Sequence, residues 1–210
     1  MNPLRTEWQR KWIGLDRQGA GAGKIQELAD AASEFCLRWI RGTPQPALLV
    51  ICGNTGTGKT HTAKAIHRFC GLSARMAFDG RNWGANRVPS TFYLSWPVAA
   101  NLFNEKNLSV MVDASENDLV VLDDVGAEND PWKICADKLC QILSRRENKF
   151  TVLTTNIMPE AWPEAFDVRI TDRLFRNSKI IELNEVASYE PGVPPVASSK
   201  ASSLTADGLR

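Results

Sequence analysis

Apolar runs alternate with helical patterns along most of the chain. Residues 47–52 are all apolar and precede a glycine-rich stretch, which is typical of a buried parallel strand. Similar runs predict further strands at residues 91–94, 119–122, 150–154 and 179–183. The periodicity between and before them predicts helices at residues 25–41, 59–70, 97–104 and 133–146. Strands that alternate with helices predict an α/β fold with a five-stranded parallel sheet.

The two ends of the chain depart from this pattern. Residues 1–24 carry several Lys and Arg side chains and end in a Gly/Ala stretch, which predicts a flexible basic arm. Residues 189–210 are rich in Pro, Ser and Ala and predict a disordered tail. We therefore expect one core domain at residues 25–188.

Composition limits the possible functions. The 210 residues suit one compact domain, and 25 Lys and Arg against 24 Asp and Glu give a net charge of +1. This balance excludes an attraction of the whole surface to nucleic acid or membrane, but not a local basic groove. A charged N-terminal stretch without a long apolar run predicts a cytoplasmic protein. The five cysteines form no CxxC pair and accompany only two histidines, so we expect buried, reduced thiols rather than a zinc site.

Residues 53–60 match the phosphate-loop pattern G-x-x-x-x-G-K-[ST] in full, with a strand before them and a helix after. The glycines let consecutive N–H groups surround a phosphate, and the helix dipole adds positive potential there. Lys59 is expected on the phosphates, and the Thr60 hydroxyl on Mg²⁺. The candidate nucleotide-binding residues are Gly53, Asn54, Thr55, Gly56, Thr57, Gly58, Lys59, Thr60 and His61. For His61 and His67, a packing or surface role fits better than catalysis.

A second motif is the strand at residues 119–122, which ends in Asp123 and Asp124. Ligands of parallel sheets lie at the carboxyl ends of strands, so Asp123 is expected near the metal and Asp124 near the attacking water. The alternative is an ordinary Asp-rich start of a loop. The strand at 91–94 lies between the two motifs along the chain. This spacing suits P-loop folds with an extra strand between the motif strands, which usually hydrolyse ATP with a carboxylate base.

Two weaker signals follow. The strand at 150–154 is followed by Asn156, which suits a residue that orients water or contacts the γ-phosphate, or else a helix cap. Arg169 and Arg173 are four positions apart, so they share one face if this stretch is helical. One of them could contact the γ-phosphate bound to a neighbouring copy of the chain. The alternative is surface ion pairs with Asp172 or Glu164.

Together these motifs resemble the DnaC/IstB branch of the AAA+ ATPases over about residues 30–185. The matching segments are residues 53–66, 91–96, 119–132, 151–162 and 168–183. The phosphate loop alone is generic, whereas DDVGAE followed by Trp132, then TTN and ITDRL, is more specific. The resemblance implies a three-layer P-loop NTPase fold, and the small size suits a loader encoded by a phage or prophage.

The resemblance also implies an ATP-driven, Mg²⁺-dependent oligomer. Such oligomers bind single-stranded DNA and bind a DnaB-type replicative helicase or a transposase. The implied roles are phosphate and Mg²⁺ binding for Lys59 and Thr60, metal binding for Asp123, catalytic carboxylate for Asp124, sensor 1 for Asn156, arginine finger for Arg173 and a second junction arginine for Arg169. The DNA route that the resemblance requires is expected at Arg81, Trp83 and Arg87, where stacking and phosphate neutralisation would act together. The alternative there is an exposed loop with a core tryptophan.

The sequence departs from the family in two places. Only a short arm and one helix precede the ATPase core, where helicase loaders often carry a partner-binding domain. Glu190 stands where many relatives have a sensor-2 arginine, which predicts weak hydrolysis. The main hypothesis is an ATPase that loads or remodels a helicase. The alternatives are an IstB-like transposition helper, a P-loop kinase, and an adaptor that changes shape with nucleotide but barely hydrolyses it.

Overall fold

The computed structural model describes residues 21–43, 45, 47–77, 88–128, 134–176 and 178–188. Within them, five parallel strands form one sheet in the order β2-β3-β4-β1-β5. The strands are β1 (Leu48–Cys52), β2 (Thr91–Ser95), β3 (Leu119–Val125), β4 (Phe150–Thr155) and β5 (Ser178–Glu182). Every residue of β1 and β4 is buried, as the continuous apolar runs predict for strands covered on both faces.

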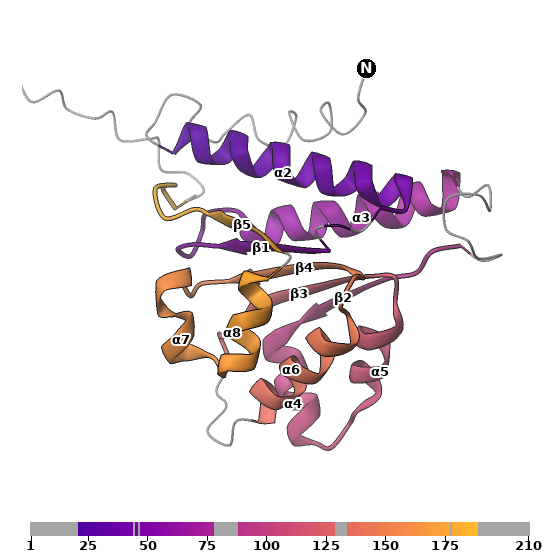
Figure 1. Cartoon of the computed structure of the whole chain (residues 1–210), viewed down its shortest axis with the longest axis vertical. Coiled ribbons are helices and arrows are strands. Elements are labelled where there is room, and N and C mark those ends of the chain that lie inside the picture. Colours follow the sequence, from indigo (N-terminus) through magenta and orange to yellow (C-terminus); the bar gives the residue numbers. More distant parts are fainter. Residues whose placement is uncertain are drawn as a thin grey trace, which may run out of the picture.

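Helices cover both faces of the sheet and make three layers (Figure 1). One face packs against α2 (Ala22–Arg41) and α3 (Lys59–Ala77). The opposite face packs against α4 (Trp96–Asn104), α5 (Ser109–Glu116), α6 (Ile134–Arg145), α7 (Trp162–Ala165) and α8 (Val168–Phe175). A short 3₁₀ helix, η1 (Pro159–Ala161), leads into α7. This arrangement confirms the predicted three-layer α/β P-loop NTPase fold.

The strand that separates the two motif strands is not the one that the chain order suggested. β2 lies at the edge of the sheet beside β3, and β4 occupies the position between β1 and β3. β4 pairs in parallel with both, so that Thr155 is level with Cys52 on one side and with Val125 on the other. The phosphate loop after β1 and the acidic end of β3 therefore face each other across the end of β4.

Several boundaries differ from the prediction. The first helix begins at Ala22, so residues 22–24 are helical, while residues 1–20 and 189–210 lie outside the described part. α3 continues through Gly71 to Ala77 instead of ending at residue 70. A Cβ atom at Gly71 would lie 3.3 Å from the Thr91 hydroxyl, so this glycine serves close packing against β2 rather than a helix end. The sequence did not predict α5, η1 or α7.

All five cysteines are buried and stay outside disulfides, as expected. Cys36 and Cys70 approach each other between α2 and α3, with their sulfur atoms 3.9 Å apart. Burial raises the pKa of the Cys70 thiol, so both side chains act as small apolar groups of the core. Among the residues described, no helix is both long enough and apolar enough to span a membrane.

A buried arginine ties the amino end of the sheet together. Arg146 is only 3% exposed, and burial lowers the pKa of its guanidinium to about 9. Its nitrogen atoms donate hydrogen bonds to the Thr151 hydroxyl and to the carbonyl oxygens of Ala114, Asn117, Asp118 and Phe150. These acceptors stabilise a charge that burial alone would disfavour.

We expect Arg146→Met to destabilise the fold strongly, because it leaves several buried carbonyl groups without a donor. The expected loss is about 3 kcal/mol, or a fall in Tm of roughly 6–12 °C in thermal unfolding. Arg145→Met is the matched control, since Arg145 is exposed, and its effect should stay within about 0.5 kcal/mol. Equal melting temperatures for the two variants would contradict the structural role of Arg146.

Candidate nucleotide-binding site

The candidate phosphate loop, residues 53–60, leaves the carboxyl end of β1 in a conformation that requires glycine. Gly53, Gly56 and Gly58 have φ values of 147°, 80° and 89°. A Cβ atom at Gly56 would lie 2.0 Å from the Ser188 hydroxyl oxygen, and one at Gly53 would lie 2.8 Å from Leu183 Cβ. Thus the segment that follows β5 lies directly against the loop and leaves room for no side chain at either position.

Lys59 is the first residue of α3 and lies inside the curl of the loop. It is 4% exposed, and its Nζ donates to the carbonyl oxygens of Gly53 at 2.8 Å and Asn54 at 2.7 Å. Burial lowers its pKa, while the nearby charge of Asp124 acts in the opposite direction. The first N–H groups of α3 have no partner within the helix and add to the positive potential. An anion at this loop would meet both the ammonium and the helix N-terminus.

Asp123 is buried at the end of β3, with 2% exposure, and both of its carboxylate oxygens accept hydrogen bonds. Oδ1 accepts from the Thr154 hydroxyl of β4 at 2.7 Å, and Oδ2 accepts from the Tyr93 hydroxyl of β2. Burial is the main cause that raises the pKa of Tyr93, followed by this hydrogen bond to Asp123. Strands on both sides of β3 therefore orient one carboxylate.

Asp124 has a left-handed backbone conformation, with a φ of 60°, at an irregularity in the pairing of β3 with β4. Such a conformation costs a non-glycine residue about 1–3 kcal/mol and is typical of functional sites. Its N–H donates to the Thr154 hydroxyl oxygen at 2.9 Å. Burial and the charge of Asp123 raise the pKa of Asp124, and the charges of Lys59 and Lys64 lower it. The half-buried carboxylate is therefore under the electrostatic influence of the phosphate loop, through Lys59, and of α3, through Lys64.

The loop after Asp124 is fixed by Glu128. One oxygen of the Glu128 carboxylate accepts the Gly126 N–H at 2.7 Å, and the other accepts the Trp96 indole N–H at 2.8 Å. Gly126 itself has a φ of 87°. This bridge from α4 holds the turn that sets the position of Asp124.

Asn156 directly follows β4, and its side chain is exposed. Because Thr155 is level with Cys52, Asn156 follows β4 beside Gly53, at the same carboxyl end of the strands as the two carboxylates. The structure thus brings the phosphate loop, Asp123, Asp124 and Asn156 to one edge. Their proposed roles in nucleotide binding and catalysis remain predictions.

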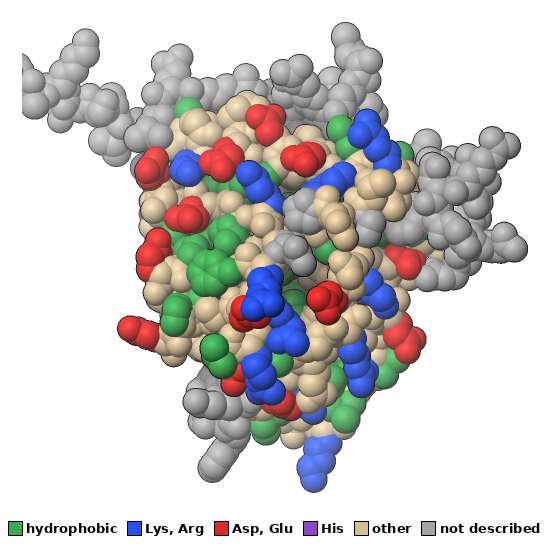
Figure 2. Space-filling view, viewed as in Figure 1, with side chains coloured by type: hydrophobic (Ala, Val, Ile, Leu, Met, Phe, Trp, Pro, Cys, Tyr) green, Lys and Arg blue, Asp and Glu red, His purple; other side chains and the backbone are tan. Residues whose placement is uncertain are grey.

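The arginines of α8 have different partners. Arg169 pairs with Asp167, which caps α8, with Nε and Oδ1 2.9 Å apart, and Arg176 pairs with Asp172 at 2.7 Å. Arg173 donates to the neutral carbonyl oxygen of Arg169 at 2.9 Å. Lys and Arg side chains gather with acidic ones over this part of the surface (Figure 2). The ion pairs leave the charge of Arg173 less compensated than that of Arg169 or Arg176.

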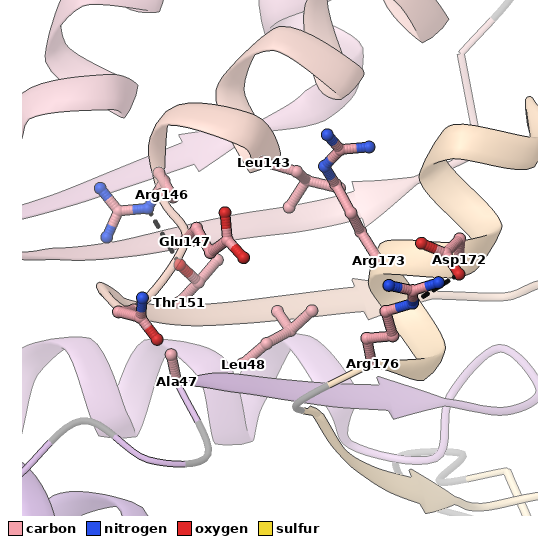
Figure 3. Close-up of a pocket in the computed structure, with 10 residues that line it drawn as sticks. Ala47, Leu48, Leu143, Arg146, Glu147, Thr151, Asp172, Arg173 and Arg176 are labelled. Carbon is pink, nitrogen blue, oxygen red and sulfur yellow. Dashed lines mark hydrogen bonds and ion pairs between the residues drawn. The ribbon is translucent and has the colours of Figure 1, made fainter.

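Arg173 lies near the amino ends of the strands, whereas the phosphate loop lies at their carboxyl ends. It lines a hollow of about 280 Å³ with Leu48 at the start of β1 and Thr151 near the start of β4 (Figure 3). β1 runs from this hollow to the phosphate loop, a separation of roughly 16 Å for five residues of strand. Arg173 therefore does not complete the nucleotide site of its own chain.

The donor set at the phosphate loop fits Mg²⁺. Thr60 supplies a hydroxyl next to Lys59, and Asp123 supplies carboxylate oxygens, the hard ligands that Mg²⁺ prefers beside substrate phosphates. In the described ranges, no group of three or more His, Cys, Asp and Glu side chains gathers to hold a metal ion. A magnesium site here would take Thr60 and Asp123 as its protein ligands beside the phosphates.

Some predicted residues lie outside the described part of the chain, namely Arg81, Trp83, Arg87, Trp132 and Glu190. Conversely, the sequence analysis assigned no role to Tyr93, Thr154 or Glu128. Thr154 and Glu128 belong to the TTN and DDVGAE segments, so a signal was present for both. For Tyr93 the only signal was a hydroxyl two residues before the end of a strand.

The fold resembles that of several solved structures. A DnaC helicase loader shares 16% identity with a TM-score of 0.54, over 84% of this chain and 99% of that chain. DnaI shares 21% identity with a TM-score of 0.53, over 74% of this chain and 81% of that chain. The replication initiator DnaA, bound to AMPPCP and single-stranded DNA, shares 18% identity with a TM-score of 0.54 over 74% of this chain. This chain spans only 44% of that DnaA chain. No family model matches the chain, and no curated protein matches it.

Proposed function

We propose that the protein is an AAA+ ATPase that assembles on single-stranded DNA and loads or remodels a DnaB-type replicative helicase. One observation carries the ATPase part: a half-buried carboxylate stands at the left-handed turn of Asp124, where the charge of Lys59 in the phosphate loop acts on it. A carboxylate placed there suits a reaction in which water accepts the phosphoryl group. A small-molecule kinase would also need a pocket for its acceptor.

The chain's own residues suggest the following division of work. Lys59 and the N-terminus of α3 would bind the phosphates, while Thr60 and Asp123 would hold Mg²⁺. The bound ion would neutralise charge that develops on the phosphates. Asp124 would accept a proton from the attacking water. The water oxygen would then bond to the γ-phosphorus while the bond between this phosphorus and ADP breaks. Asn156 would orient that water.

The partners follow from a different line of support. Among the similar structures, DnaC is a helicase loader, and the replication initiator DnaA is bound to single-stranded DNA. Arg81, Trp83 and Arg87 are the proposed DNA contacts of this chain. A net charge of +1 gives one copy little general attraction to DNA, so an assembly that repeats a basic loop would bind by multivalency.

The position of Arg173 supports an oligomer. Because Arg173 lies near the amino ends of the strands, it suits a role at the phosphate loop of an adjoining copy rather than at the phosphate loop of its own chain. Arg169, already paired with Asp167, would support the junction as a second arginine.

Asp124→Asn tests the proposed chemistry. The amide keeps the shape of the side chain but accepts no proton, so ATP binding should stay within about twofold and turnover should fall by about 10²-fold or more. ATP hydrolysis is measured with and without single-stranded DNA, and binding with a fluorescent ATP analogue. Asp113→Asn, an exposed acid on α5, is the matched control.

The outcomes separate the proposed ATPase from its alternatives. The proposal is supported if single-stranded DNA stimulates turnover by the unmodified chain and the Asp124→Asn substitution abolishes this turnover. Nucleotide binding without turnover would identify an adaptor, and turnover that needs a small-molecule acceptor would identify a kinase. Either of these results would overturn it.

A further inference from the structure

Tyr93 connects the edge strand β2 to the acidic end of β3. It is level with Val121 of β3, two residues before Asp123, and alternate residues of a strand share a face. Tyr93, Val121 and Asp123 therefore lie on the face of the sheet that α3 covers. From there the Tyr93 hydroxyl reaches diagonally and donates to Oδ2 of Asp123.

The aromatic ring of Tyr93 is held by α3, the helix that begins at Lys59. The Lys64 ammonium lies 5.5 Å from the ring centroid, and the His67 ring centroid lies 5.9 Å from it. The ring is half-buried between this helix and the sheet. Its position is thus fixed independently of its hydroxyl, so removing the oxygen atom alone should leave the packing in place.

The hydrogen bonds at Asp123 are divided between its two oxygens. Thr154 donates to Oδ1 and also accepts the Asp124 N–H, so that contact belongs to the turn of β3. Tyr93 donates only to Oδ2. A hydroxyl that donates to a carboxylate stabilises its negative charge and occupies one of its acceptor directions. A cation, or water bound to one, that approaches Oδ2 must therefore share this oxygen with Tyr93.

We propose that Tyr93 is a positioning residue that sets the Mg²⁺ requirement of the site, because its hydroxyl orients Asp123 and competes for Oδ2. This inference rests on the proposed function, in which Asp123 and Thr60 hold Mg²⁺. The hydroxyl keeps the carboxylate in one orientation and weakens its attraction for the ion. Loss of the hydroxyl should therefore strengthen metal-dependent binding while making turnover at saturating Mg²⁺ slower.

Tyr93→Phe removes this hydroxyl and keeps the ring. Binding of a fluorescent ATP analogue to the full chain is titrated with Mg²⁺, and binding of Mn²⁺ with ATP is followed by electron paramagnetic resonance. We expect the half-saturating metal concentration to fall roughly threefold to tenfold, the size of one ordinary hydrogen bond. Thr91→Val is the matched control, because it removes a hydroxyl from the same strand and face without touching Asp123.

An unchanged or raised half-saturating concentration in Tyr93→Phe would overturn the inference. Tyr93→Leu, which also lacks the hydroxyl, provides a second measurement if the first variant folds poorly, and the same shift is expected. If the unmodified chain shows no metal-dependent nucleotide binding, the proposed function itself fails. A normal response of the unmodified chain with no shift in either variant removes only the role of Tyr93.

Discussion

Lys59→Ala is expected to weaken binding of ATP with Mg²⁺ by about 100-fold or more, because it removes the buried cation of the phosphate loop. Lys59 is 4% exposed and lies within the curl of the loop, where little water is available to replace its charge. Its Nζ donates to two loop carbonyl groups, of Gly53 and Asn54. These contacts hold the ammonium where the phosphates are proposed to bind.

The shift of the melting temperature with nucleotide measures this effect. A ligand that binds only the folded state raises stability in proportion to the logarithm of its concentration over Kd. ATP with Mg²⁺ should raise the Tm of the unmodified chain and leave that of Lys59→Ala unchanged. Arg68→Ala, which alters an exposed cation on the same helix, should respond as the unmodified chain does. An undiminished shift in Lys59→Ala would place the nucleotide elsewhere.

The phosphate loop could be predicted from the sequence because its chemistry is local. Eight consecutive residues fix the glycine conformations, the lysine and the start of the helix, and Gly53, Gly56 and Gly58 have positive φ angles in the structure. The fold class was also predictable, since fully buried strands such as β1 and β4 appear as continuous apolar runs. Neither inference required knowledge of which strands are neighbours.

Features that depend on strand order could not be predicted. The contacts of Tyr93 and Thr154 with Asp123 exist because β2 and β4 flank β3, which the order of strands along the chain does not reveal. The left-handed turn at Asp124 likewise depends on its pairing with β4. α5 escaped prediction because it is only eight residues long and half of them are polar, with Met111, Ala114 and Ser115 as its buried residues.

Arg173→Ala is expected to lower ATP turnover of the assembled protein by about 10³-fold, with little change in a single copy. The reason is geometric, since Arg173 lines a hollow with Leu48 and Thr151, at the amino ends of β1 and β4 (Figure 3). The phosphate loop follows the carboxyl end of β1. Its guanidinium donates to a neutral backbone carbonyl, whereas Arg169 and Arg176 are in ion pairs. Arg176→Ala, which breaks an exposed ion pair, is the comparison variant and should change turnover far less.

Mixing Arg173→Ala with Asp124→Asn tests most directly whether each site is shared between two copies. Neither variant alone should hydrolyse ATP appreciably. In an equal mixture, a junction that takes Asp124 from one variant and Arg173 from the other is complete, so turnover should recover to about one quarter of the unmodified rate. If the mixture stays as inactive as its components while both variants still assemble, Arg173 does not act across a junction, and the account of the site is contradicted.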